Sequence, residues 1–92
     1  MIVHIVLLQT KAEVKDEEIS AALEQVRGLQ QSIPGLTAVQ AGKSSYQGYT
    51  YGFVMQFVDA EHLKAYISHP AHQRVAEELQ RLCQKALDFD IE

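Results

Sequence analysis

Residues 48–73 read GYTYGFVMQFVDAEHLKAYISHPAHQ, and the first part of this stretch decides the fold. Every odd-numbered residue from Tyr49 to Phe57 is large, whereas the residues between them are mostly smaller or polar. Successive side chains of an extended chain point to opposite faces, so the large residues would share one face. The stretch therefore predicts a long aromatic strand over residues 49–58, with one face suited to a core.

Two helical segments follow this strand, and a proline separates them. Asp59 can cap a short helix, and the predicted inner face of that helix is formed by Leu63, Tyr66 and Ile67. Pro70 cannot donate a backbone hydrogen bond, which suits the first turn of a new helix. The apolar stripe of this last helix is predicted to contain Ala71, His72, Val75, Ala76, Leu79, Leu82, Cys83 and Ala86.

The remaining segments complete an alternation of strands and helices. Residues 2–9 and 36–43 are predicted strands, residues 44–48 a turn, and residues 87–92 alternate apolar and acidic side chains like a half-exposed strand. A helix should begin near Asp16 and end at Pro34-Gly35. This order predicts a ferredoxin-like βαββαβ fold of the α+β class, in which both helices lie on one face of a four-stranded antiparallel sheet. We expect residues 1–92 to form this single domain.

The sheet should carry apolar residues on both faces, although helices cover only one. The strand over residues 2–9 reads IVHIVLLQ, so its two faces are apolar apart from one imidazole. The bare face, including Leu8 or its neighbours, needs cover, and a second copy of the chain is the simplest source. We therefore predict a homodimer.

Charge and cysteine content exclude several classes of partner. Eight basic and twelve acidic residues give a formal net charge of −4, and no basic cluster is present, so we predict no binding to nucleic acid. No apolar run approaches the roughly 18–20 residues of a membrane span, which predicts no membrane partner. The apolar start lacks a basic region and a cleavage site, so it is interpreted as a mature strand. The single cysteine, Cys83, is typical of a cytoplasmic protein.

Three side chains with polar tips could converge beneath the helices. His72 shares a helix face with Val75 and Leu79, so its imidazole would be partly desolvated and would titrate near neutrality, as a general base requires. Tyr66 would also point toward the sheet, where its protonated phenol could donate to a developing enolate oxygen. His4 lies on the first strand. A histidine or tyrosine in such a place is more commonly a core residue with a satisfied hydrogen bond, and both alternatives stay open.

The other candidate residues favour structural roles. His69 precedes Pro70 and should cap or bond locally, and His62 is predicted to lie at the surface. His69 and His72 could supply two metal ligands at most, so we predict no metal site, and no motif for a cofactor is present. Cys83 is predicted to be inert packing. Asp88, Asp90 and Glu92 would share one side of the last strand, either attracting a hard cation or forming an acidic edge against aggregation.

The chain resembles the stress-responsive A/B barrel domain (Dabb) family. The resemblance rests on His4, the GYT start of the aromatic strand and the HPAHQ sequence at residues 69–73, and it extends from His4 to Phe89. It implies a small dimeric α+β barrel without cofactors. One branch is similar to olivetolic acid cyclase, which closes a polyketide chain by aldol condensation. Its Tyr-x-x-His-Pro-x-His motif is matched by residues 66–72.

That branch implies roles for individual residues of this chain. Tyr66 and His72 would be the catalytic pair, and His4 would be a ligand-binding histidine of the pocket. Tyr51 stands where the branch has a histidine, and Leu23 and Val26 stand where it has aromatic residues. The resemblance implies that these positions also contact the ligand.

Three functions remain open from the sequence. The first is a dimer that binds a small apolar or carbonyl-bearing molecule. The second is a cofactor-free enzyme that transfers a proton next to a carbonyl group, as in an aldol-type cyclisation. The third is a small oxygenase that needs neither metal nor flavin. A fold alone does not choose among them, because the ferredoxin-like unit hosts many functions.

Overall fold

Strands and helices alternate along the chain in the order that the sequence predicts. The computed structural model describes all residues, 1–92. Its elements are β1 (Ile2–Thr10), α1 (Asp16–Gly28), a short 3-10 turn (Leu29–Gln31), β2 (Leu36–Tyr46), β3 (Tyr49–Phe57), α2 (Ala60–Ile67), α3 (Pro70–Leu82) and β4 (Cys83–Ile91).

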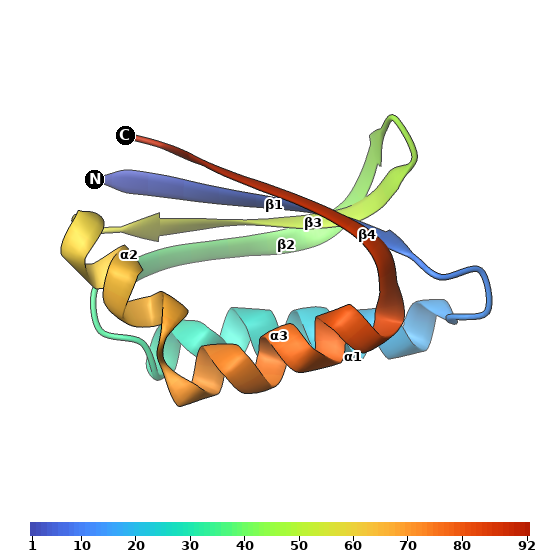
Figure 1. Cartoon of the computed structure of the whole chain (residues 1–92), viewed down its shortest axis with the longest axis horizontal. Helices are drawn as coiled ribbons and strands as arrows, with labels where there is room; N and C mark the ends of the chain where they lie inside the picture. The colour runs from blue at the N-terminus through green and yellow to red at the C-terminus, as the bar shows by residue number, and fades with distance from the viewer.

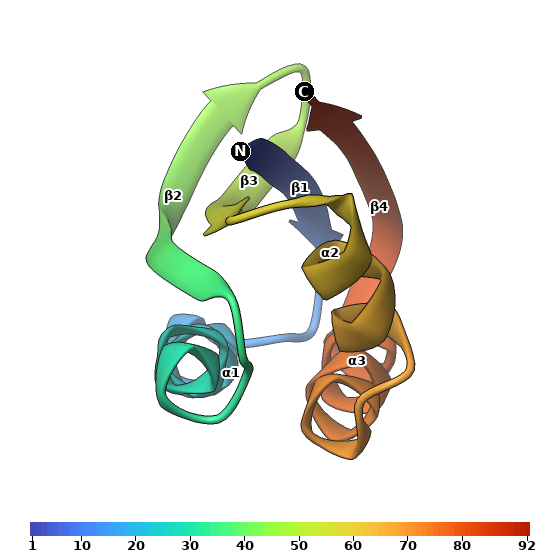
Figure 2. The ribbon, with the colours of Figure 1, turned by 90° about the vertical axis from the view of Figure 1, so that its left-hand side faces the viewer.

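The four strands form one antiparallel sheet in the order β2-β3-β1-β4. Figure 1 shows the helices on one side of this sheet, and Figure 2 shows α1 and α3 next to each other beneath it, with β2 and β4 at its two edges. The predicted ferredoxin-like fold is therefore confirmed. The longest helices have 13 residues, and none has the length and apolarity that a membrane span requires.

The core lies between the helices and one face of the sheet. The predicted alternation of β3 is confirmed, because its odd-numbered residues from Tyr49 to Phe57 are buried. The even-numbered residues of β1 join them, since His4 pairs with Met55 and Val6 with Phe53. Apolar residues of α1 at helical spacing complete the core from below; they are Ile19, Ala22, Leu23 and Val26.

Local hydrogen bonds explain where the two C-terminal helices begin. The Asp59 carboxylate accepts from the backbone N–H of His62 at 2.9 Å, and so caps α2 as predicted. The N-cap of α3 is His69, whose Nδ1 accepts from the backbone N–H of Ala71 at 3.0 Å. This bond confirms the predicted local role of His69. Pro70 follows as the first residue of α3, so the cap and the proline together fix the break between the helices.

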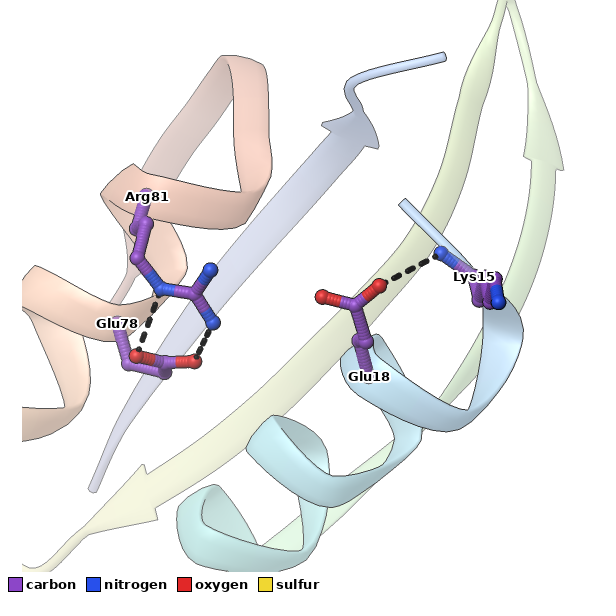
Figure 3. Close-up of polar contacts among 4 residues, drawn as sticks. All are labelled: Lys15, Glu18, Glu78 and Arg81. Atoms are coloured by element: carbon purple, nitrogen blue, oxygen red, sulfur yellow. Dashed lines mark hydrogen bonds and ion pairs between the residues drawn. The ribbon is translucent and has the colours of Figure 1, made fainter. Parts of the chain in front are cut away.

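Charged side chains lie where α1 and α3 pack against each other. Figure 3 shows two contacts there. The Glu18 carboxylate accepts from the backbone N–H of Lys15 at 3.3 Å, and Arg81 donates twice to Glu78, at 3.2 and 2.5 Å. The Lys15 side chain has no acceptor, so the reciprocal half of a capping box is missing. Glu78 and, more weakly, Glu18 raise the pKa of Arg81. These exposed pairs orient side chains between the helices and add little to stability.

The face of the sheet opposite the helices carries a continuous apolar surface. Val3, Ile5 and Leu7 of β1 lie there and are half-buried, whereas Leu8 is buried on the helix side. The prediction named Leu8 or its neighbours, and the structure places the neighbouring Leu7, not Leu8, on this face. In register with these positions, β4 adds three exposed side chains, Leu87, Phe89 and Ile91. We call these six residues the outer apolar face.

Several predicted boundaries or faces are corrected by the structure. The first helix, predicted to end at Pro34-Gly35, ends at Gly28 and is followed by the 3-10 turn. Ile67 was expected on the inner face of α2, but it is 56% exposed because the helix ends there. Helix α3 ends at Leu82, and Cys83 begins β4 with an extended backbone (φ −114°, ψ 139°). Cys83 and Ala86 therefore belong to a strand, since pairing with β1 outweighs their helical spacing. Strand β2 also continues to Tyr46.

Candidate functional site

A cavity of about 410 Å³ lies between α3 and the helix-facing side of β1 and β4. Apolar side chains from the sheet and the helix form most of its wall. The lining residues are His4, Val6, Leu8 and Phe53 from the sheet centre, His72, Val75, Ala76, Leu79 and Gln80 from α3, and Cys83, Gln84, Lys85, Ala86 and Asp88 from β4. It is partly open to solvent. Two of its polar groups are imidazoles, from β1 and from the first turn of α3.

His72 lies on the cavity wall with one ring nitrogen occupied. Its Nδ1 is 2.9 Å from the backbone carbonyl oxygen of Ile67. A carbonyl can only accept, so Nδ1 carries the proton of the neutral ring and Nε2 keeps its lone pair. Nε2 has no hydrogen-bond partner, whereas every fully buried side-chain nitrogen or oxygen has one, so this atom retains some exposed surface. The geometry leaves His72 able to accept a hydrogen bond or a proton from a molecule in the cavity.

Tyr66 connects the two imidazoles. Its ring centroid lies 4.3 Å from that of His72 and 6.2 Å from that of His4. The side chain is 3% exposed, and this burial raises the pKa of the phenol. The hydroxyl makes no hydrogen bond within the protein, and Tyr66 is not among the residues that line the cavity. A protonated phenol without a partner can donate to a ligand.

His4 is the buried polar residue of the core, at 8% exposure, and it has a carboxylate partner. Its Nδ1 lies 2.6 Å from Asp90 Oδ1. The two residues face each other directly across the β1–β4 ladder. The sequence left two roles open for Asp90, a cation site or an acidic edge, and the structure turns it and Asp88 toward the helices. The signal that could have found this contact is register, because His4 and Asp90 share a face only in this pairing.

The other predicted ligand-binding residues lie away from the cavity. Leu23 and Val26 are buried in the core, at 2% and 0% exposure, and do not line it. Tyr51 is also buried, and its hydroxyl donates to Asp16 Oδ1 at the start of α1, at 2.5 Å. This hydrogen bond and burial raise the pKa of Tyr51 to about 12. The structure therefore brings together His4, Tyr66 and His72, and places Tyr51, Leu23 and Val26 elsewhere.

Other titratable groups have local roles. His62 Nδ1 lies 2.6 Å from Asp59 Oδ1, and this contact holds the pKa of Asp59 below its usual range. Cys83 lines the cavity, but burial raises the pKa of its thiol, which disfavours a thiolate nucleophile. The Lys85 ammonium lies 5.4 Å from the centre of the Tyr49 ring. No three His, Cys, Asp or Glu side chains lie together as a metal site would require.

The family can now be assigned. The model of the stress responsive A/B barrel domain, Dabb, matches residues 2–92. The chain belongs to the Dabb family. No protein of curated function matched the sequence.

Solved structures of the same fold extend this assignment. A dimeric ferredoxin-like protein of unknown function from Jannaschia sp. CCS1 is 32% identical and superposes with a TM-score of 0.88, over 99% of this chain and 97% of that one. A protein from Arabidopsis thaliana is 29% identical, with a TM-score of 0.92, over 100% and 94% of the two chains. A hydroxynitrile lyase from Passiflora edulis shares the fold at 18% identity, with a TM-score of 0.89 over 98% and 90%.

In this Dabb protein, the cavity therefore offers two histidine Nε2 acceptors, from His4 and His72, whereas Tyr66 contacts the His72 ring but does not itself line the cavity. The rest of its wall is mostly apolar. Tyr66 and His72 would act together most directly with their polar tips in hydrogen-bond contact inside a closed pocket. The rings are in contact, but no hydrogen bond joins them, and the cavity is open. This geometry is suited to holding a small molecule in the cavity against His4 and His72.

Proposed function

We propose that this Dabb protein is a homodimer that binds a small, largely apolar molecule carrying a carbonyl or hydroxyl group in the cavity beneath α3. The cavity carries the proposal. Its volume of about 410 Å³ lies within the range of small-molecule sites, roughly 300–1,000 Å³. Its apolar wall would contact the ligand skeleton, while His4 and His72 would orient its polar group and Tyr66 would support the His72 ring. A cytoplasmic location stays a prediction, which the free Cys83 supports.

The outer apolar face supports the homodimer. Leu87, Phe89 and Ile91 are 43%, 44% and 53% exposed, and they lie beside the half-buried Val3, Ile5 and Leu7. An exposed continuous apolar surface on a small protein marks an interaction site. The Jannaschia relative is dimeric, so a second copy of this chain is the occupant that we propose.

Binding can be tested by blocking the cavity. Ala76 lines it, whereas Gln73 lies on the same helix, is exposed and does not line it. We expect Ala76→Trp to weaken the binding of small aldehydes, ketones or phenols by at least tenfold in calorimetric titrations. Gln73→Trp adds the same side chain outside the cavity and should bind like the parent. Equal affinities of the two variants, or no binding to the parent, would reject the proposal.

A second candidate function is proton transfer next to a carbonyl group. The observation that favours it is the tautomer of His72, because the bond to Ile67 leaves Nε2 free to act as a general base. Tyr66 would donate to the enolate oxygen that forms. We expect His72→Ala to lose about 10²–10⁴-fold in rate on any carbonyl substrate that reacts, with the dimer intact. Tyr66→Phe should lose somewhat less. Activity that does not depend on His72 would reject this mechanism.

A further inference from the structure

Asp90 does not line the cavity, although its contact with the lining residue His4 is among the shortest in the protein. Asp90 Oδ1 is 2.6 Å from His4 Nδ1, and the side chains are 45% and 11% exposed. The partly exposed carboxylate thus approaches the buried imidazole from the edge strand. The contact occupies Nδ1 of His4, so Nε2 is the ring nitrogen that remains for a molecule in the cavity.

The chemistry of this contact fixes the proton on the ring. A carboxylate can only accept, so the neutral His4 ring must carry its proton on Nδ1. Nε2 then has a lone pair. It makes no hydrogen bond and, like His72 Nε2, retains some exposed surface, because every fully buried side-chain nitrogen or oxygen has a partner. Since His4 lines the cavity, the lone pair is available to a ligand there.

We propose that Asp90 is a positioning residue, which holds His4 in the tautomer that offers Nε2 to a cavity ligand as a second hydrogen-bond acceptor. The inference rests on the cavity being the ligand site, as proposed above. It adds Asp90 of β4 to the site, and it predicts that the site prefers a ligand group that donates a hydrogen bond, such as a hydroxyl. Without Asp90, His4 would be free to protonate Nε2, and that atom would donate instead of accept.

The tautomers can be read directly by long-range ¹H–¹⁵N NMR spectra of the imidazole rings near pH 7.5. His4 and His72 should both show the Nδ1–H form. His69 is an internal reference for the opposite form, because its Nδ1 accepts from the backbone N–H of Ala71. We expect Asp90→Ala to move His4 to the Nε2–H form and to leave His72 and His69 unchanged.

Two variants separate positioning from charge. Asp90→Asn removes the charge but keeps an oxygen that can accept from Nδ1–H, so it should retain the parent tautomer. Glu92→Ala removes a carboxylate that makes no hydrogen bond or ion pair, and His4 should not respond. An Nε2–H tautomer of His4 in the parent, or an unchanged tautomer in Asp90→Ala, would overturn the proposal. So would an Asp90→Asn variant that behaves like Asp90→Ala.

A pair of probes tests the consequence for binding. 4-Ethylphenol and 4-ethylanisole differ in whether their oxygen carries a proton. The parent should prefer the phenol, and Asp90→Ala should reduce this preference about fivefold, which corresponds to one lost hydrogen bond. A preference that stays unchanged in Asp90→Ala would contradict the inferred role. If neither probe binds, the proposed ligand site fails, whereas the tautomer of His4 still decides whether Asp90 positions the ring.

Discussion

The two faces of β4 differ in chemistry, whereas those of β3 differ in burial. Toward the helices it presents Asp88 and Asp90, the first on the cavity wall and the second on His4. Away from them it presents Leu87, Phe89 and Ile91, which are exposed. In a monomer that used β4 only for its own core, apolar side chains would face the helices and acidic ones the solvent. Here the arrangement is reversed.

The reversal indicates that each face of β4 serves a different contact. The inner face borders a cavity and a buried imidazole, where carboxylates can hydrogen-bond. The outer apolar face would have to be covered by another surface, which the proposed homodimer supplies. The strand is therefore an edge of the chain's own core, with its polar side toward the candidate site and its apolar side available to the proposed partner.

The largest effect is expected from neighbouring residues on opposite faces of β3. Met55 faces the helices at 0% exposure, and Val54 faces away and is half-buried. Met55→Ala should lower the free energy of unfolding by about 2–5 kcal/mol at any protein concentration, because it leaves a cavity in the core. Val54→Ala should cost less, and its cost should depend on protein concentration if a partner covers that face. Urea titrations at several concentrations compare the two.

One result for Val54→Ala would contradict the proposed dimer interface. If Val54→Ala lowered stability by the same amount at every concentration, the outer face of β3 would not be part of a dimer interface. The proposed cover for that face would then have to be abandoned.

A somewhat smaller effect is expected when charge enters the outer apolar face. Phe89 is 44% exposed and pairs with Ile5 in register. Phe89→Lys should raise the dimer dissociation constant about 30-fold or more, since removing a central aromatic residue typically costs at least about 2 kcal/mol and the new charge opposes burial. Sedimentation velocity between nanomolar and micromolar concentration measures this shift.

Asp88→Asn is the matching change on the other face of the same strand. It alters a neighbouring residue whose side chain points toward the cavity, so the dimer should persist. Two results would contradict the proposed interface: dissociation of the dimer by Asp88→Asn, or a Phe89→Lys variant that remains dimeric.

Local patterns were sufficient to predict most of the fold. The alternation of large residues in β3, the Asp59 cap and the Pro70 break depend on neighbours in sequence, and the structure confirms each. The end of α3 could not be read in this way. Cys83 and Ala86 continue the helical spacing, but the backbone hydrogen bonds to β1 decide their conformation. Tertiary pairing of this kind overrides local propensity.

The candidate site was predictable in part, for a related reason. Tyr66 and His72 meet because they follow one another across a short helical break, and His4 joins them from the strand beneath. Asp90 was assigned to a cation site or an acidic edge, since alternation fixes which residues share a face but not which face turns inward. That choice depends on the register between β1 and β4, which no local pattern in either strand specifies.

The smallest expected effect concerns the Tyr51 hydroxyl on the inner face of the sheet. Its contribution to stability should change only at high pH. The Tyr51 hydroxyl donates to Asp16, and this contact raises the pKa of Tyr51 to about 12 from an ordinary value of 10.0. Between these values the unfolded chain loses the Tyr51 proton while the folded chain keeps it, so stability falls as pH rises from 10 toward 12. Tyr51→Phe removes this titration together with a hydrogen bond of about 1 kcal/mol. The parent should therefore be the more stable protein at pH 8, and its advantage should shrink as pH rises above 10. Urea unfolding of both proteins from pH 8 to 11 measures the difference, and an advantage that stayed constant would show that this hydrogen bond does not control the ionisation of Tyr51.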